Sequence, residues 1–249
     1  MSGPRIRPSQ FITTYGPGSI IEASNGPRLI KHFFDGVFKE KDLDISKYEI
    51  TEPRLSKALQ EKPEVQVKFA RIPSNAELKL PETRGVYSTR RFPHWSICTA
   101  KHQHKVNSYI VYKYQFNSTH TCPECPPETT PKKAYNKAGR EAIRFITACE
   151  NGHMSDIDWK WQVCRTKDCS DYLYMSGSGA LKNIKIYCPS CNSSRSLLSI
   201  YKTSEKCRGF NQENYGEQED CDLKSKVVHR GAAYLRFPEL STSLKIEPN

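Results

Sequence analysis

The chain has 249 residues, with 38 Lys and Arg against 27 Asp and Glu, which gives a formal net charge of +11 and a pI near 9.1. Hydrophobic residues make up 37% and the mean hydropathy is −0.69, so one large apolar core is excluded in favour of smaller lobes. The sequence shows neither a secretory segment nor a stretch of about 18 apolar residues, so it predicts no membrane span and a cytoplasmic setting.

Residues 1–84 are expected to form an amino-terminal α+β region. A Gly-Pro turn at 15–19 leads into a strand at 20–21. Apolar pairs at helical spacing predict a short amphipathic helix over 29–38, and alternation predicts a half-buried strand over 64–72.

Residues 85–249 are expected to form a cysteine-rich, zinc-binding region whose ribbon-like core covers about 149–237. The expected strands are 109–114, 143–148, 172–176, 183–188, 196–201 and 227–237. A Gly-Ser-Gly turn at 177–179 joins two of them, and 126–133 is typical of an exposed linker. The predicted fold class is α+β: β-rich lobes held together by zinc, with a zinc-ribbon-like module and a few short helices.

Ten cysteines are the strongest motif signal in the chain. Two pairs form the knuckles Cys122-Pro-Glu-Cys125 and Cys188-Pro-Ser-Cys191, in which both sulfurs can face one tetrahedral ion. In a reducing compartment this spacing favours zinc over disulfides or free buried thiols. We expect two or three structural Zn²⁺ ions, because each can contribute roughly 10–16 kcal/mol of apparent binding energy to the folding of a small lobe.

The first predicted site contains three cysteines: Cys98, Cys122 and Cys125. Its fourth ligand has to come from a nearby histidine. The spacing Cys98-x₃-His102 is the best, with His104 and His120 as substitutes. A histidine among so many basic residues could equally contact phosphate.

The second predicted site combines Cys164-x₄-Cys169 with Cys188-x₂-Cys191, separated by two strands and a turn as in a zinc ribbon. A third, weaker site combines four residues: Cys149, His153, Cys207 and Cys221. Alternatively, the first two of these shape a turn and the last two lie in a small core. Pairings between the second and third sites could also be exchanged.

The sequence predicts a protein that is not an enzyme. Every candidate site is filled by protein ligands, whereas a catalytic zinc keeps one position open. A hydrolytic arrangement of Glu150, Asp156 and Asp158 around His153 is an alternative, but HExxH and deaminase patterns are absent. We expect Asp156 instead to cap the helix that carries Trp159. The chain also has no Walker A or GxSxG motif.

A segment from Arg84 to Lys113 interleaves cations with aromatic residues, a composition typical of nucleic-acid binding. The candidate phosphate contacts are Arg90, Arg91, Lys101, His104 and Lys105. Alternatively, the aromatic residues form the core of a strand pair. A second basic group near the end is equally consistent with a solvated strand face: Lys224, Lys226, His229, Arg230 and Arg236.

Four blocks of the sequence, in the same order, resemble DrmB-type proteins. They are Arg7-Pro8-Ser9-Gln10-Phe11-x-Thr13-Thr14-Tyr15-Gly16-Pro17-Gly18, Arg144-Phe145-Ile146-x-Ala148-Cys149-x-Asn151-Gly152-His153-x-x-Asp156-x-x-Trp159, Cys188-x-x-Cys191-x-x-x-Arg195-Ser196-Leu197, and Arg230-Gly231-Ala232-Ala233-Tyr234-x-x-Phe237-Pro238 with Ser241 and Ser243-Leu244. The resemblance implies a part in the DISARM type of anti-phage defence, zinc binding, DNA binding and a superfamily 2 helicase partner similar to DrmA. It implies no catalysis by this chain, which corresponds to the amino-terminal part of the longer relatives.

The leading hypothesis is a non-catalytic, zinc-binding, DNA-binding accessory subunit of a helicase, acting in anti-phage defence. The alternative is a zinc-ribbon interaction module in transcription or RNA handling, which would prefer RNA or a polymerase. A zinc-dependent nuclease or deaminase is the third hypothesis, and it predicts metal-dependent turnover that Asp156→Ala abolishes.

Overall fold

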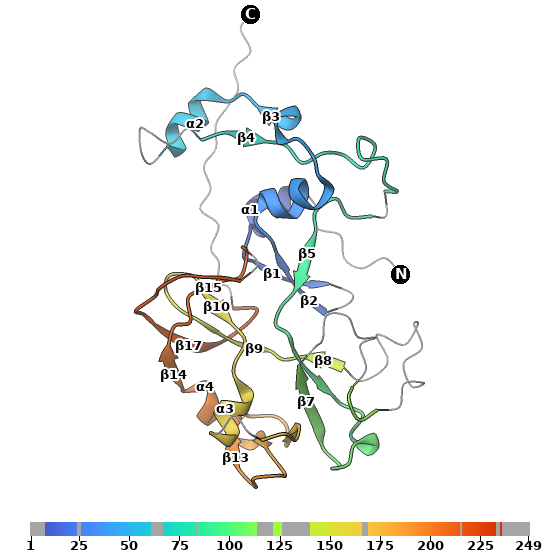
Figure 1. Cartoon of the computed structure of the whole chain (residues 1–249), viewed down its shortest axis with the longest axis vertical. Helices are drawn as coiled ribbons and strands as arrows, with labels where there is room; N and C mark the ends of the chain where they lie inside the picture. Colours follow the sequence, from blue (N-terminus) through green and yellow to red (C-terminus); the bar gives the residue numbers. More distant parts are fainter. Residues whose placement is uncertain are drawn as a thin grey trace, which may run out of the picture.

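The computed structural model describes residues 8–23, 26–60, 67–82, 84–113, 122–125, 140–165, 169–214, 216–232 and 235. These residues form mostly β-structure with a few short helices (Figure 1), which confirms the predicted α+β class. The expected linker at 126–133 and the substitute ligand His120 lie outside the described residues.

The elements are short and numerous. The strands are β1 (Ile20–Ala23), β2 (Gly26–Ile30), β3 (Glu49–Ile50), β4 (Phe69–Ala70), β5 (Thr89–Arg91), β6 (Trp95–Cys98), β7 (Tyr109–Lys113), β8 (Arg140–Ala142), β9 (Phe145–Ala148), β10 (Met154–Ser155), β11 (Leu173–Ser176), β12 (Lys185–Tyr187), β13 (Ser194–Ser196), β14 (Ser204–Lys206), β15 (Phe210–Asn211), β16 (Glu217–Gln218) and β17 (Lys224–His229). The α-helices are α1 (Pro8–Thr13), α2 (Pro53–Leu59), α3 (Trp159–Cys164) and α4 (Leu197–Tyr201). A π-helical turn covers Phe34–Phe38, and 3₁₀ turns cover Lys39–Lys41, Ile45–Tyr48, Lys101–Gln103 and Leu181–Asn183.

Two sheets carry the carboxy-terminal part of the described chain. The larger has six strands in the order β13-β12-β11-β7-β6-β8, and the smaller has four in the order β10-β9-β17-β14. Their strand pairs are antiparallel, with Tyr174 opposite Tyr187 in the first sheet and Val227 opposite Thr147 in the second. The cysteines lie mainly where these strands begin and end, so the sheets decide which thiols meet.

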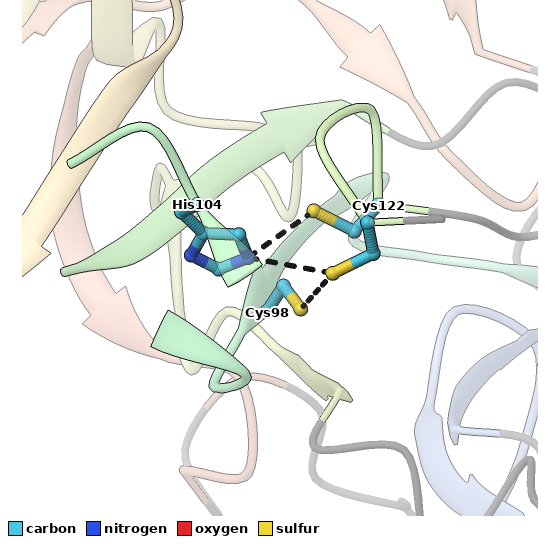
Figure 2. A group of neighbouring side chains, drawn as sticks. Cys98, His104 and Cys122 are labelled. Carbon is cyan, nitrogen blue, oxygen red and sulfur yellow. Dashed lines mark hydrogen bonds between the residues drawn. The ribbon is translucent and has the colours of Figure 1, made fainter. Parts of the chain in front are cut away.

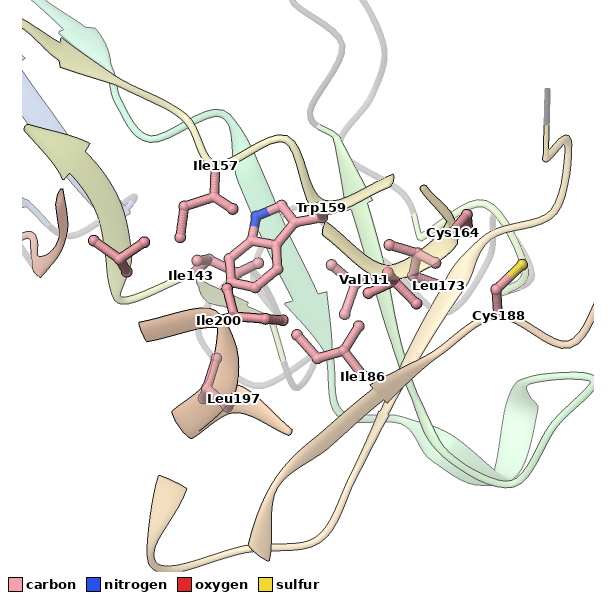
Figure 3. Packing of buried hydrophobic residues seen from close by; sticks show 12 residues of the cluster. Val111, Ile143, Ile157, Trp159, Cys164, Leu173, Ile186, Cys188, Leu197 and Ile200 are labelled. Carbon is pink, nitrogen blue, oxygen red and sulfur yellow. The ribbon is translucent and has the colours of Figure 1, made fainter. Parts of the chain in front are cut away.

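The main apolar cluster lies between the six-stranded sheet, α3, α4 and β17. Figure 3 shows the ring of Trp159 close to Ile143, Ile157 and Ile200, all of them buried. Cys164 and Cys188 belong to the same cluster. Two thiols of one predicted zinc site are therefore also part of the core.

A second apolar cluster joins the beginning of the chain to its end, because Leu29 and Phe92 pack there with Ile146, Met154 and Val228. Leu29 belongs to a three-stranded sheet of order β1-β2-β5. The division into 1–84 and 85–249 stays a prediction, although strands from both sides of it share this sheet.

Local interactions explain the elements that hold the cysteines. Helix α3 begins at Asp158, whose carboxylate accepts the backbone N–H of Trp161 at 3.0 Å. It ends at Arg165, which adopts the left-handed conformation. Gly177 allows the tight connection after β11, because a Cβ there would lie 2.0 Å from the Asn183 carbonyl oxygen.

Three local predictions were wrong. The segment 196–201 forms helix α4, because the Ser196 hydroxyl caps its first turn by accepting the N–H of Ser199. The expected helix over 29–38 is strand β2 followed by a π-helical turn, since Leu29 pairs with β1 and β5. Asp158, and not Asp156, caps the helix that carries Trp159.

No helix in the described part of the chain is long and apolar enough to cross a membrane.

Candidate metal centres

The structure gathers the ten cysteines and two histidines into three groups of four, which we call the first, second and third tetrads. The first tetrad is Cys98, His104, Cys122 and Cys125. The second tetrad is Cys164, Cys169, Cys188 and Cys191. The third tetrad is Cys149, His153, Cys207 and Cys221. Within each tetrad the ligand atoms all lie within 4.8 Å of one another, so the three tetrads are positioned to bind metal ions.

The first tetrad forms beside the end of β6 (Figure 2). Cys98 is the last residue of β6, and the knuckle at 122–125 lies opposite it. The Nε2 atom of His104 is 3.4 Å from the sulfur of Cys122 and 3.6 Å from that of Cys125. The sulfurs of Cys98 and Cys125 are 3.7 Å apart.

His104, and not His102, is the histidine of this tetrad. The 3₁₀ turn Lys101–Gln103 leaves His102 exposed, whereas the following residue, His104, is buried. The Nδ1–H of His104 donates to the carbonyl of Ser108 at 2.7 Å, which leaves Nε2 as the metal-binding atom. The predicted ligand His102 is therefore corrected to His104, and the prediction that His104 contacts phosphate is wrong for the same reason.

A carboxylate fastens the first knuckle to the sheet. Glu124, which lies between the two knuckle cysteines, accepts the hydroxyl of Tyr174 on β11 at 2.6 Å and the backbone N–H of Lys105 at 3.0 Å. The loop that carries His104 and the strand β11 are thereby tied to the same side chain. This role of Glu124 could not be predicted from the sequence, because Tyr174 lies 50 residues further along the chain.

The second tetrad is built on the β11–β12 hairpin and α3. Cys164 ends α3, Cys169 precedes β11, and Cys188 and Cys191 lie in the turn between β12 and β13. The sulfurs of Cys169 and Cys188 are 3.6 Å apart. The structure thus brings together the four residues that spacing predicts, while the zinc-ribbon designation of this hairpin stays a prediction.

The third tetrad lies at one end of the four-stranded sheet, where the ends of β9 and β14 meet the starts of β10 and β17. Cys149 follows β9, His153 precedes β10, Cys207 follows β14 and Cys221 precedes β17. The Nδ1 atom of His153 is 3.4 Å from the sulfur of Cys149 and 3.6 Å from that of Cys207. These are the four residues proposed together from the sequence.

His153 is oriented by an acidic residue outside the tetrad. Its Nε2–H donates to the carboxylate of Glu219 at 2.5 Å, so Nδ1 is left to face the thiols. Metal-binding histidines usually donate their second ring N–H to such an acceptor, which fixes the tautomer and raises the basicity of the ligand atom. No motif in the sequence marks Glu219 for this role.

The spacing of the ligand atoms fits a tetrahedral ion and not a disulfide. A disulfide needs sulfurs about 2.05 Å apart, whereas the sulfurs of Cys169 and Cys188 are 3.6 Å apart and those of Cys98 and Cys125 are 3.7 Å apart. Metal–sulfur bonds of about 2.3 Å and metal–nitrogen bonds of about 2.05 Å give tetrahedral edges of about 3.8 Å for S···S and 3.6 Å for S···N. The observed S···N distances of 3.4 and 3.6 Å match this in both histidine-containing tetrads.

The thiols of the first and second tetrads differ in pKa. A hydrogen bond from the Cys122 thiol lowers the pKa of Cys98 to about 5, and the same bond raises the pKa of Cys122. Burial raises the pKa of Cys164, whereas hydrogen bonds from Ser193 lower that of Cys191 to about 6. Cysteine binds a metal as the thiolate, so a divalent cation bound there would displace the remaining protons.

The predicted phosphate contacts are scattered by the fold. Arg90 donates to both the backbone and the side-chain oxygen of Gln212, and Arg91 donates to the hydroxyl of Ser96 at 2.8 Å. Both arginines are half-buried and tie strand β5 to other segments. Lys105 is exposed beside the first tetrad, and Lys101 is half-buried in the 3₁₀ turn.

Asp156 takes part in a contact that the sequence did not indicate. Its carboxylate accepts the backbone N–H of His94 at 2.9 Å and pairs with the ring Nδ1 of the same residue at 2.7 Å. This contact joins the segment before β6 to the segment after β10. It gives Asp156 a structural partner in place of the expected helix cap.

The described chain is thus a β-rich protein with three four-residue Cys/His groups that are positioned to bind metal ions. The chain belongs to the family described as Domain of unknown function (DUF8724), whose model matches residues 7–237. It is also distantly similar to the DISARM protein DrmB of Bacillus paralicheniformis, with 23% identity over 194 residues. That match covers 73% of this chain and 31% of DrmB, so the matched part spans about a third of the relative's length.

Proposed function

We propose that this protein is a non-catalytic, zinc-binding accessory subunit of an anti-phage defence complex of the DISARM type, and that it binds DNA beside a helicase partner. The observation that carries the proposal is the set of three complete tetrads in a distant relative of DrmB. Zn²⁺ suits them because thiolate and imidazole in tetrahedral array are its preferred ligands. Ten cysteines kept as metal ligands and not as disulfides favour the reducing cytoplasm as the location of the protein.

A structural role for the ions follows from ligand number. Each tetrad offers four protein ligands, which fill a tetrahedral shell and leave no position for a substrate or a reactive water. The first and second tetrads hold the two ends of the six-stranded sheet, and the third holds the four-stranded sheet. The ions would supply stability that the low apolar content of the chain does not.

A cationic face on the four-stranded sheet supports DNA binding better than the arginines of β5 do. Lys206 on β14 lies directly opposite Lys224 on β17, and Lys226 follows on the same face. All three are exposed, and Asp222 is the one carboxylate paired with Lys206 in the described residues, at 3.9 Å. Like charges opposite one another destabilise a sheet, so an anionic ligand across this face would relieve the repulsion.

The test measures DNA affinity over a salt series for the full chain, alone and with its helicase partner. Replacing Lys206, Lys224 and Lys226 together with Gln should reduce the slope of log K against log salt by about 2.7 for duplex DNA. The matched control, Lys47→Gln with Lys57→Gln and Lys79→Gln, removes equal charge from exposed sites elsewhere and should leave the slope unchanged. Undetectable binding of the native protein at low salt, with and without the helicase, would reject the proposal.

A further inference from the structure

Helix α3 presents a half-exposed indole at the surface beside the second tetrad. One face of α3 is buried through Trp159 and Val163, whereas Trp161 points outward and is 39% exposed. Exposure of so large an aromatic side chain is unfavourable in water unless a partner covers it. Its backbone is fixed by the Asp158 cap, so the ring is held on a short, rigid element.

One guanidinium group lies over this ring, and a second lies near the first. Arg165 follows Trp161 by four residues, and its guanidinium carbon lies over the indole at 5.8 Å from the ring centroid. Arg195 on β13 is fixed by hydrogen bonds to the side-chain oxygen of Gln162 at 2.5 Å and to the hydroxyl of Ser199 at 3.3 Å. Burial lowers the pKa of Arg195, and the charge of Arg165 lowers it further, so the two cations repel one another.

The carboxylates near α3 are already occupied. Glu205 accepts the amide of Gln162 at 2.5 Å, and Asp158 pairs with Arg208 at 3.6 Å. In the part of the chain that the structure describes, no carboxylate forms an ion pair with Arg165. The surface formed by Trp161, Arg165 and Arg195, which we call the indole–arginine surface, therefore combines a flat ring with two guanidinium groups, of which Arg195 also interacts with the carboxylate of Glu205.

We infer that the indole–arginine surface binds an unpaired nucleotide of a single-stranded nucleic acid. The base stacks on Trp161, and the adjoining phosphates lie against Arg165 and Arg195. A nucleotide fits because it joins a π-face to an anion, whereas duplex bases are stacked internally and cannot reach the indole. The inference rests on the proposed nucleic-acid function and adds to it a preference for unpaired strands.

The experiment uses fluorescence anisotropy of the full, metal-loaded chain with labelled dT₁₂, rU₁₂ and a 12-base-pair duplex. Trp161→Ala should weaken binding of the single strands by about 5- to 100-fold, and leave duplex binding within about twofold. Trp161→Phe keeps a ring and should retain most of the affinity. Phe34→Ala removes another exposed ring, far along the chain, and should change nothing.

A second variant tests the charge. Arg165→Gln should reduce the salt slope for dT₁₂ by about 0.7, as expected for one lost phosphate contact on a single strand. Arg165 is not a ligand in any of the three tetrads, so the number of bound ions should stay the same. Comparison of dT₁₂ with rU₁₂ identifies whether DNA or RNA is the source of the strand.

The outcomes separate this inference from the proposed function. If the native chain binds duplex and single strands but Trp161→Ala binds dT₁₂ and rU₁₂ as tightly as the native chain, the indole–arginine surface is not the site. The lysine face could still be correct in that case. If the native chain binds none of the three probes, both proposals are wrong.

Discussion

Cys188 tests the role of the second tetrad most directly, because it is both a ligand and part of the core. Its side chain is 0% exposed and packs in the cluster that contains Trp159. A structural zinc site contributes roughly 10–16 kcal/mol, or about 2.5–4 kcal/mol per ligand if shared equally. A serine hydroxyl in the same place adds about 1–3 kcal/mol for a buried polar group without a partner.

Cys188→Ser should therefore cost about 3.5–7 kcal/mol, which is much of the 5–15 kcal/mol that stabilises an ordinary domain. Native mass spectrometry should show one ion fewer, and backbone amides of β11 and β12 should exchange with solvent at least a hundredfold faster. Cys191→Ser should lose the same ion with a smaller effect on exchange, because Cys191 is exposed and leaves no buried hydroxyl.

Ser190→Ala is the control, because it changes the same knuckle and keeps all four ligands. It should retain the ion and the slow exchange of the native protein. A Cys188→Ser protein that still binds the full number of ions, with native exchange in β11 and β12, would show that this tetrad does not stabilise the hairpin through metal.

Three further predictions concern the neighbouring contacts. His104→Gln should reduce the ion count by one in native mass spectrometry, whereas His102→Gln should not; equal counts for the two variants would contradict the assignment. Glu219→Gln should weaken the third site by about 10- to 100-fold in a chelator competition, since it removes the carboxylate that orients its histidine. Arg90→Ala should lower the free energy of unfolding by about 1.5–3 kcal/mol in urea denaturation, because it removes charged hydrogen bonds to Gln212. An unchanged denaturation midpoint would instead leave Arg90 available for phosphate.

The ligand group of the second tetrad could be proposed from spacing, because it is a pair of short-range motifs, Cys164 with Cys169 and the knuckle at 188–191. The third tetrad contains one such motif, Cys149 with His153, whereas thirteen residues separate Cys207 from Cys221. The α+β class was predictable for a similar reason. Runs of β-branched and aromatic residues marked strands β7, β9 and β11, and no long helical pattern competed with them.

Features that depend on distant partners could not be predicted. Spacing favours His102 over His104, and the Ser108 carbonyl that orients His104 toward the thiols comes close to it only in the folded loop. The segment 196–201 is apolar enough to predict a strand, but Ser196 caps a helix that covers Leu197–Tyr201. The basic sequence around Arg90 predicts a phosphate contact, but the fold places Gln212 beside Arg90, which donates a hydrogen bond to it.

The tetrads are nested along the chain. The third joins residues 149–153 to residues 207–221, and the whole of the second, from Cys164 to Cys191, lies between those halves. The entropic cost of closing a loop grows with the length of flexible chain in it, so the second tetrad costs less conformational entropy to form than the third. Once the second tetrad has bound its ion, the flexible chain between the two halves of the third tetrad is effectively shorter. Metal uptake should therefore follow an order, inner before outer, and under zinc scarcity the outer site should be the first to empty.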